Sequence, residues 1–233
     1  DRGMISWTKL IGKRTDDDKF KNDEITAFDR NEEGDIFASL RSEWNSGSYQ
    51  KYSESKIVTY ASDGNGETFY SIGENQDELN NNLDAYDIEV AKDGGIYVGG
   101  HTNYDLYGQE VTSNSNDYNS SDAFVSKFDE NGSHLWTKLL GGVGREGAYT
   151  LELDEDSNDI YVGGVTRSEF DEQKLKGDKD GFIAKFDKDG KKIWTKFIGT
   201  AGADVIKDIV ISEESSYDMQ THTMMSENCI YVV

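Results

Sequence analysis

The sequence has no proline, a single cysteine (Cys229) and no run of 18 apolar residues. One cysteine excludes a disulfide within the chain, and short apolar runs exclude a membrane-spanning helix. No basic stretch followed by an apolar one opens the sequence, so no signal peptide is visible. Basic residues are scarce, with 24 Lys and Arg against 46 Asp and Glu and a net charge of −22. Because phosphate-rich partners require clustered basic residues, we expect no nucleic acid and no anionic membrane as a main partner.

Apolar residues make up only 35% of the chain, below the ~45–50% of an ordinary globular protein. Low hydrophobicity with high charge is typical of disordered chains. Aromatic residues, however, reach 12%, and their large side chains can build a core. We therefore expect a folded, strongly acidic protein.

Three short motifs recur along the chain, and the repeat decides the expected fold. An Ile/Leu-Trp-Thr-Lys run, an Ile-Tyr-Val-Gly-Gly run and a Phe-Val/Ile-x-Lys-Phe-Asp run follow one another in a fixed order. The first motif occupies residues 6–12, 135–141 and 193–199, with a degenerate copy at 68–73. The second occupies residues 96–100 and 160–164, with outer copies at 36–39 and 230–233. The third occupies residues 122–129 and 180–187, with a weaker copy at 56–60. Trp7, Phe69, Trp136 and Trp194 align in the first motif and mark a period of 58 to 67 residues.

Each repeat predicts four short antiparallel strands, separated by Asn-Gly and Asp-Gly turns that favour hairpins. The Ile-Tyr-Val runs are apolar on both faces, which indicates a sheet enclosed between two others. Four-stranded repeats of this kind are typical of β-propellers. The predicted fold is all-β, a β-propeller of four-stranded antiparallel blades with about four blades in these residues.

Two longer runs carry a resemblance to a known family. Residues 122–142 read Asp-Ala-Phe-Val-x-Lys-Phe-Asp-x-x-Gly-x-x-x-Trp-x-x-x-x-Gly-Gly, and residues 154–166 read Asp-x-Asp-x-Asn-x-Ile-Tyr-Val-Gly-Gly-x-Thr. Both resemble the bacterial SBBP-type β-propeller repeat, clearly over residues 84–211 and weakly over 1–83. The resemblance implies a propeller fold and a secreted or cell-surface location in bacteria. It implies no catalytic residue.

The repeat divides the chain into units within one domain, residues 1–233. Complete units cover residues 13–73, 74–141 and 142–199, and partial units cover 1–12 and 200–233. Fifteen strands are expected where four closed blades need sixteen. We therefore expect a propeller fragment of a longer chain, whose unpaired terminal strands are a candidate surface for self-association.

Aromatic residues outside the repeat are the candidate ligand-binding residues. Trp7, Trp136 and Trp194 recur at one position and are expected to pack between blades. Trp44 is off the repeat and is expected in the loop between the second and third strands of its unit. The long loop of residues 103–121 adds three tyrosines, so the candidates are Trp44, Tyr104, Tyr107 and Tyr118.

Acidic turns are candidate calcium sites, because Ca²⁺ prefers clustered carboxylate and carbonyl oxygens. The alternative is that these side chains cap turns through their own backbone. The candidate ligands are Asp154, Asp156, Asn158, Asp178, Asp180, Asp187 and Asp189. No other cofactor is expected.

No residue pattern indicates catalysis. His101, His134 and His222 have no zinc-ligand spacing and are interpreted as lone surface or rim histidines. Cys229 has no evident base to activate it. The leading hypothesis is a non-catalytic extracellular module that binds a protein or polysaccharide partner. Two alternatives stay open: a structural subunit of a surface layer, filament or virus particle, and a polysaccharide hydrolase or lyase.

Overall fold

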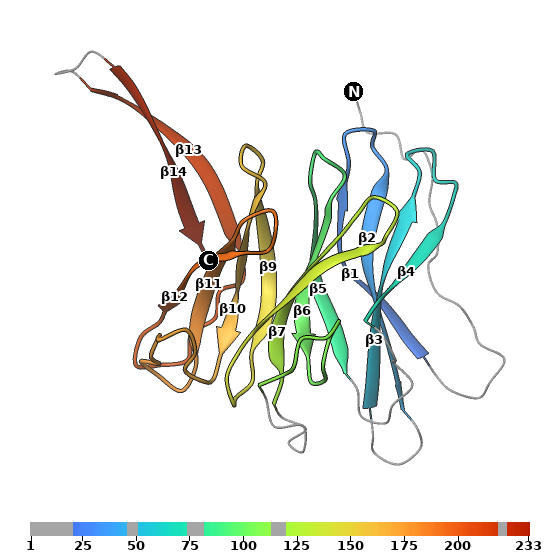
Figure 1. The fold of residues 1–233 in the computed structure, drawn as a ribbon, viewed down its shortest axis with the longest axis horizontal. Helices are drawn as coiled ribbons and strands as arrows, with labels where there is room; N and C mark the ends of the chain where they lie inside the picture. Colours follow the sequence, from blue (N-terminus) through green and yellow to red (C-terminus); the bar gives the residue numbers. More distant parts are fainter. Residues whose placement is uncertain (1–20, 46–50, 74–81, 113–119, 219–222) are drawn as a thin grey trace.

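A computed structural model describes residues 21–45, 51–73, 82–112, 120–218 and 223–233. All regular structure in these ranges is β (Figure 1). None of it includes a helix able to span a membrane. The strands are β1 (Lys21–Arg30), β2 (Ile36–Asn45), β3 (Lys51–Tyr60), β4 (Thr68–Ile72), β5 (Leu83–Val90), β6 (Ile96–Thr102), β7 (Asp122–Phe128), β8 (His134–Leu140), β9 (Gly147–Asp154), β10 (Asp159–Thr166), β11 (Asp180–Phe186), β12 (Lys192–Ile198), β13 (Ile209–Asp218) and β14 (Thr223–Val232).

Strands that are consecutive in the chain pair antiparallel into three four-stranded sheets and one hairpin. The first sheet is β1–β4, the second is β5–β8, the third is β9–β12, and the hairpin is β13–β14. The prediction of an all-β chain of four-stranded antiparallel meanders is therefore confirmed. The expected strand in the motif of residues 6–12 lies outside the described residues.

The turns explain why each sheet is a meander. Gly132 and Gly190 end the turns before β8 and β12 with φ angles of 75° and 78°, a conformation that glycine adopts without strain. In the second of these turns Asp187 Oδ1 accepts hydrogen bonds from the amides of Asp189 (3.0 Å) and Lys191 (2.8 Å). Local side-chain capping and a left-handed glycine thus reverse the chain within a few residues.

The sheets lie face to face in a row, with the hairpin at one end (Figure 1). The opening strand of each sheet packs on the sheet before it: β5 contacts β1, β2 and β3, and β9 contacts β5, β6 and β7. β13 in turn contacts β9. Since β1 and β13 lie toward opposite ends of the row, the described strands form no closed ring.

Strand β6 shows how one sheet serves two interfaces. All of its residues are buried. Ile96 and Val98 join the core cluster shared with the first sheet, whereas Tyr97 joins the cluster shared with the third. Apolar side chains on both faces therefore reflect burial on both faces, as the Ile-Tyr-Val pattern predicts.

The repeated tryptophans pack between sheets where the structure describes them. Trp136 on β8 contacts Phe186 of the third sheet, with ring centroids 6.5 Å apart, and its Nε1 donates to the carbonyl of Lys188 at 3.2 Å. Trp194 on β12 lies beside Tyr161 of its own sheet, with ring centroids 5.9 Å apart, and packs on the cluster that includes Ile209 of the hairpin. Trp7 lies outside the described residues.

The alignment of Phe69 with these tryptophans is wrong. Phe69 is 49% exposed, while its neighbour Tyr70 lies against Gly132 of the second sheet. Trp136 lies in the same way against Gly190 of the third sheet. The connection before β4, residues 61–67, is longer than the corresponding residues 129–133 before β8, and it shifts the aromatic position by one residue. In a strand one residue changes the face.

Candidate functional site

A cavity of about 150 Å³ lies where the ends of the second and third sheets meet. One wall comes from the end of β6, and the others come from the connection between β8 and β9, the end of β10 and the approach to β11. The lining residues are His101, Arg145, Glu146, Gly147, Tyr149, Val165, Arg167 and Lys179.

Glu146 organises the cavity wall from within. Its side chain is buried, and Oε1 accepts hydrogen bonds from the Ser168 hydroxyl (2.8 Å), the Thr166 hydroxyl (3.1 Å) and the Arg167 amide (3.2 Å). Oε2 accepts from the amide of Gly142 at 3.1 Å. Burial raises the pKa of Glu146, and these hydrogen bonds oppose that rise. The carboxylate thus joins the β8–β9 connection to the end of β10.

Cations surround the cavity. Arg145 and Arg167 are exposed and flank Glu146 in the fold, and Lys179 is partly buried. Lys207 adds a fourth positive charge, because its Nζ lies 4.5 Å from the centroid of the Tyr149 ring. Among the residues that the structure describes, Arg145, Arg167 and Lys179 form no ion pair with a carboxylate. In a chain of net charge −22, this leaves a local positive site.

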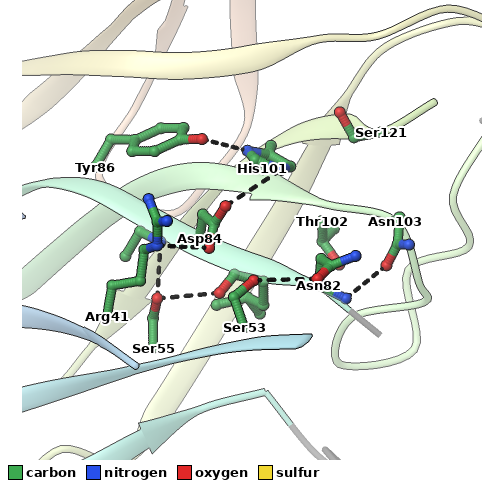
Figure 2. Close-up of polar contacts among 12 residues, drawn as sticks. Arg41, Ser53, Ser55, Asn82, Asp84, Tyr86, His101, Thr102, Asn103 and Ser121 are labelled. Atoms are coloured by element: carbon green, nitrogen blue, oxygen red, sulfur yellow. Dashed lines mark hydrogen bonds and ion pairs between the residues drawn. The ribbon is translucent and has the colours of Figure 1, made fainter. Parts of the chain in front are cut away.

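A polar chain extends behind His101 into the second and first sheets (Figure 2). The hydroxyl of Tyr86 and His101 Nδ1 are 2.9 Å apart. His101 Nε2 lies 3.7 Å from Asp84 Oδ2, and Asp84 Oδ1 lies 3.3 Å from Arg41 Nε. These polar contacts therefore connect β2, β5 and β6 at the strand ends beside the cavity. The Tyr86 ring also packs edge-on against Tyr149, with centroids 5.2 Å apart.

The pKa values of His101 and Tyr86 are shifted away from neutral pH in opposite directions. Burial lowers the pKa of His101 to about 4, although Asp84 opposes the change, so the imidazole is neutral at pH 7. Burial raises the pKa of Tyr86, so its hydroxyl keeps its proton. Proton transfer is most effective when the pKa lies near the working pH. The pair therefore suits the orientation of neutral hydrogen-bonding groups better than acid–base catalysis.

His101 is buried, so its interpretation as a surface or rim histidine is wrong. The sequence contains no sign of its partner, because Tyr86 is 15 residues away and meets it only through the pairing of β5 with β6. His134 is partly buried and stacks on Tyr107, with ring centroids 3.6 Å apart. His222 lies outside the described residues.

The predicted aromatic ligand-binding residues lie away from this cavity. Trp44 belongs to β2, where it pairs with Tyr52, so its expected loop position is wrong. Three added residue pairs lengthen this hairpin beyond the repeat. Tyr104 and Tyr107 are partly buried against the core cluster of the first and second sheets, and the Tyr107 oxygen accepts from the Gly73 amide at 2.9 Å. Tyr118 lies outside the described residues.

The predicted calcium ligands are spread over several turns. Asp154 Oδ1 accepts from the amides of Asp156 (3.1 Å) and Ser157 (3.3 Å), and buried Asp180 accepts from the amides of Lys176 (2.8 Å) and Gly177 (3.2 Å). Asp187 caps its turn as described above. Asn158 has a positive φ of 55°, while Asp156, Asp178 and Asp189 are exposed. The described ranges contain no group of three or more His, Cys, Asp or Glu placed to hold a metal. Calcium binding stays a prediction.

A row of carboxylates along the opening strands was not foreseen. Asp29 on β1 accepts from the amide of Val90 on β5 at 2.8 Å, and Asp87 on β5 accepts from the amide of Leu151 on β9 at 2.7 Å. Glu152 on β9 accepts from the amide of Ile211 on β13 at 3.0 Å. Each carboxylate thus joins one opening strand to the next.

The repeat contains a signal for two of these carboxylates, Asp29 and Glu152, whose position in the second sheet is occupied by Glu89 rather than Asp87. Asp29, Glu89 and Glu152 each precede the Ile that opens the following strand, Ile36, Ile96 or Ile160, by seven or eight residues. Burial, reinforced by neighbouring carboxylates that include Asp29 and Glu152, raises the pKa of Glu89 to about 9. Burial likewise raises the pKa of Asp87 to about 6, against two backbone hydrogen bonds.

No family model matches the chain. The chain is similar to the regulatory protein FlaEY of Caulobacter vibrioides, with 28% identity over 170 residues. The match covers 68% of this chain and 17% of FlaEY, so the chain spans less than a fifth of that relative. The similarity is to one part of a much longer bacterial protein.

Proposed function

We propose that the chain is a β-propeller, or part of a larger one, that serves as a non-catalytic binding module for a protein or glycan partner. Three observations support the propeller: each sheet is a four-stranded meander, its opening strand packs on the sheet before it, and one face-to-face interface is repeated along the row. The fold alone does not define the function, which depends on the site.

The observation that carries the binding role is the cation-lined cavity. Arg145, Arg167 and Lys179 converge on it while the rest of the chain is strongly acidic. Unpaired cations around a concave site favour a ligand with a complementary group. The neighbouring tyrosines contribute aromatic surface, which is common in recognition sites.

Binding accounts for this site better than catalysis does. A hydrolase or lyase at this cavity would need a proton-transfer group poised near neutral pH. His101 and Tyr86 are displaced from that range in opposite directions. The name of the bacterial relative, a regulatory protein, agrees with a role that operates through binding. A secreted or cell-surface location in bacteria is part of the proposal and is supported by the resemblance to SBBP-type repeats.

A glycan array combined with a product-release assay tests the proposal. We expect the wild-type chain to bind at least one glycan or protein and Arg145→Glu with Arg167→Glu to abolish that binding. Lys196→Gln, which removes an exposed charge on β12 outside the cavity lining, is the matched control. Release of soluble sugar that disappears in His101→Ala would contradict the non-catalytic role. Binding that survives both arginine substitutions would show that the ligand binds outside this cavity.

A further inference from the structure

The cations at the cavity, two of which are exposed, have no carboxylate partner, whereas half-buried cations elsewhere in the described residues do. Lys185 lies 2.8 Å from Asp159, and Arg41 lies 3.3 Å from Asp84. Within the described ranges, Arg145, Arg167 and Lys179 have no such partner, although they share one cavity. Like charges held close together repel one another, and this arrangement is relieved when an anion is bound.

The acidic groups nearest the cavity are already engaged. Glu146 accepts four hydrogen bonds from Gly142, Thr166, Arg167 and Ser168, and its side chain is buried. Asp84 faces Arg41 and His101 in the second sheet. These contacts hold both carboxylates in place, and neither forms an ion pair with Arg145, Arg167 or Lys179. An external anion can therefore supply the ion-pair partner that these cations lack among the described residues.

The size of the cavity limits what can enter. A volume of about 150 Å³ corresponds to about five water molecules at ~30 Å³ each. This is below the ~300–1,000 Å³ of a pocket that encloses a whole drug-sized ligand. The cavity therefore accommodates one functional group of a ligand, with the remainder of the ligand outside.

The charge of the whole chain selects among anions. A net charge of −22 repels highly charged polymers over distances of about a Debye length, ~8–10 Å in physiological salt. A single negative charge suffers least from this repulsion and still gains the local contacts. The planar guanidinium groups of Arg145 and Arg167 match the two oxygens of a carboxylate.

We infer that this cavity binds one carboxylate group, carried by an acidic sugar residue or by the free end of a peptide. The inference rests on the proposed function, because it specifies the chemistry by which the same face recognises its partner. Neutral His101 and the ring of Tyr149 form the uncharged wall beside the cations.

Isothermal titration of the full chain with matched small probes tests the inference. The probes are glucuronate against glucose, and the free acid of trialanine against its amide. We expect saturable binding of at least one acid and none of its uncharged analogue. The better acid identifies the source of the carboxylate. Arg145→Gln, Arg167→Gln and Lys179→Gln should each weaken binding about tenfold, the effect of losing one charge-assisted hydrogen bond. Lys196→Gln should leave the affinity unchanged.

Three results would overturn the inference. The first is absence of saturable binding of both acids up to about 100 mM, a concentration far above the millimolar affinity of a weak site. The second is equal binding of an acid and its uncharged analogue. The third is displacement of the acid by heparin at a lower concentration of negative charge, which would indicate a polyanion site.

The two proposals fail in different ways. If the array finds a neutral ligand whose binding depends on Arg167, the binding module stands and the carboxylate inference fails. If glucuronate or trialanine binds as expected but no glycan or protein partner is found, the carboxylate site stands and the proposed function fails. Melting curves of every variant test whether it is folded. The side chains of Arg145, Arg167, Lys179 and Lys196 are at least partly exposed, whereas that of His101 is buried.

Discussion

Two sets of charges lie between neighbouring sheets, and the fold uses them in opposite ways. Along the opening strands, Asp29, Asp87 and Glu152 point into the next sheet and accept hydrogen bonds from its backbone. At the strand ends, Arg145 and Arg167 are exposed beside a cavity and pair with no carboxylate among the described residues. The carboxylates hold neighbouring sheets together, while the cations are available to a ligand.

The difference is one of burial and of partners. A buried carboxylate costs desolvation energy, so it persists where backbone amides or cations compensate it. An exposed guanidinium has no such cost and needs no partner. Burial thus separates the acidic residues that hold sheets together from the basic residues that can recognise a ligand.

Glu89 differs from the carboxylates at the equivalent position of the other sheets. It occupies the position of Asp29 and Glu152 in the repeat, but no hydrogen bond from the next opening strand compensates its burial. Its pKa is raised to about 9, far above the ordinary value of a glutamate. Ionisation of Glu89 therefore opposes folding.

Trp136→Ala should have the largest effect, because it opens the interface that carries both sets of charges. We expect the free energy of unfolding to fall by about 3 kcal/mol, the lower end for removal of a large aromatic side chain, since Trp136 is partly exposed. Trp194→Ala, facing only the hairpin, should cost about 2 kcal/mol. Urea denaturation measures both. Losses below about 1 kcal/mol for both variants would show that the tryptophans do not hold the sheets together.

Glu89→Gln should stabilise the protein at neutral pH. Because the pKa of Glu89 is higher in the folded protein than in the unfolded chain, folding takes up a proton. Stability is therefore greatest below the unfolded value near 4.5 and decreases as the pH rises toward about 9. The free energy of unfolding of the variant should be about 2 kcal/mol higher at pH 7 than that of the wild type, and it should decrease less between pH 5 and 9.

Denaturation midpoints of Glu89→Gln and wild type across that pH range measure this effect. Glu110→Gln is the control, because Glu110 is exposed and follows the far end of β6, whereas Glu89 pairs with Tyr97 at the start of that strand. Its loss should change the pH profile little. Parallel profiles for wild type and Glu89→Gln would mean that Glu89 is not the titrating group.

Tyr86→Phe should lower the stability of the protein without changing its affinity for a ligand, because Tyr86 supports the cavity but does not contact the ligand. Loss of the hydroxyl leaves His101 Nδ1 without its 2.9 Å partner, which should cost about 1–2 kcal/mol of stability. Affinity for a carboxylate ligand should stay within about twofold, because the cations remain in place. Stability by denaturation and affinity by titration are measured on one preparation. A tenfold loss of affinity with unchanged stability would make Tyr86 a ligand contact.

Calcium should have the smallest effect. If the acidic turns bind Ca²⁺ with a Kd near 1 mM, then 5 mM Ca²⁺ stabilises the fold by about 1 kcal/mol. For a chain of this size that corresponds to a rise of about 2–4 °C in Tm. Melting curves with Ca²⁺, with chelator and with Mg²⁺ at equal ionic strength provide the measurement. Identical curves would exclude calcium binding at the turns that cap themselves through Asp154 and Asp187.

The repeat was sufficient to predict the strands and their pairing, because both depend on local patterns. Alternation, glycine turns and β-branched runs act over fewer than ten residues, and the Ile-Tyr-Val runs correctly indicated burial on both faces. The errors arose where the repeat is irregular. Trp44 continues a lengthened hairpin, and Tyr70 takes the position assigned to Phe69 because one residue reverses the face of a strand.

The sequence by itself determined an acidic, all-β chain of four-stranded meanders, since composition, period and turn chemistry are local properties. Only the tertiary structure decided which charges meet. His101 contacts Tyr86 through strand pairing. Arg145 and Arg167 come together because Glu146 joins two segments that are separate in the chain, and Lys179 lines the same cavity from the approach to β11. A repeated motif specifies the interface that recurs between sheets. The cavity depends on residues outside the motif, whose proximity results from packing between neighbouring sheets.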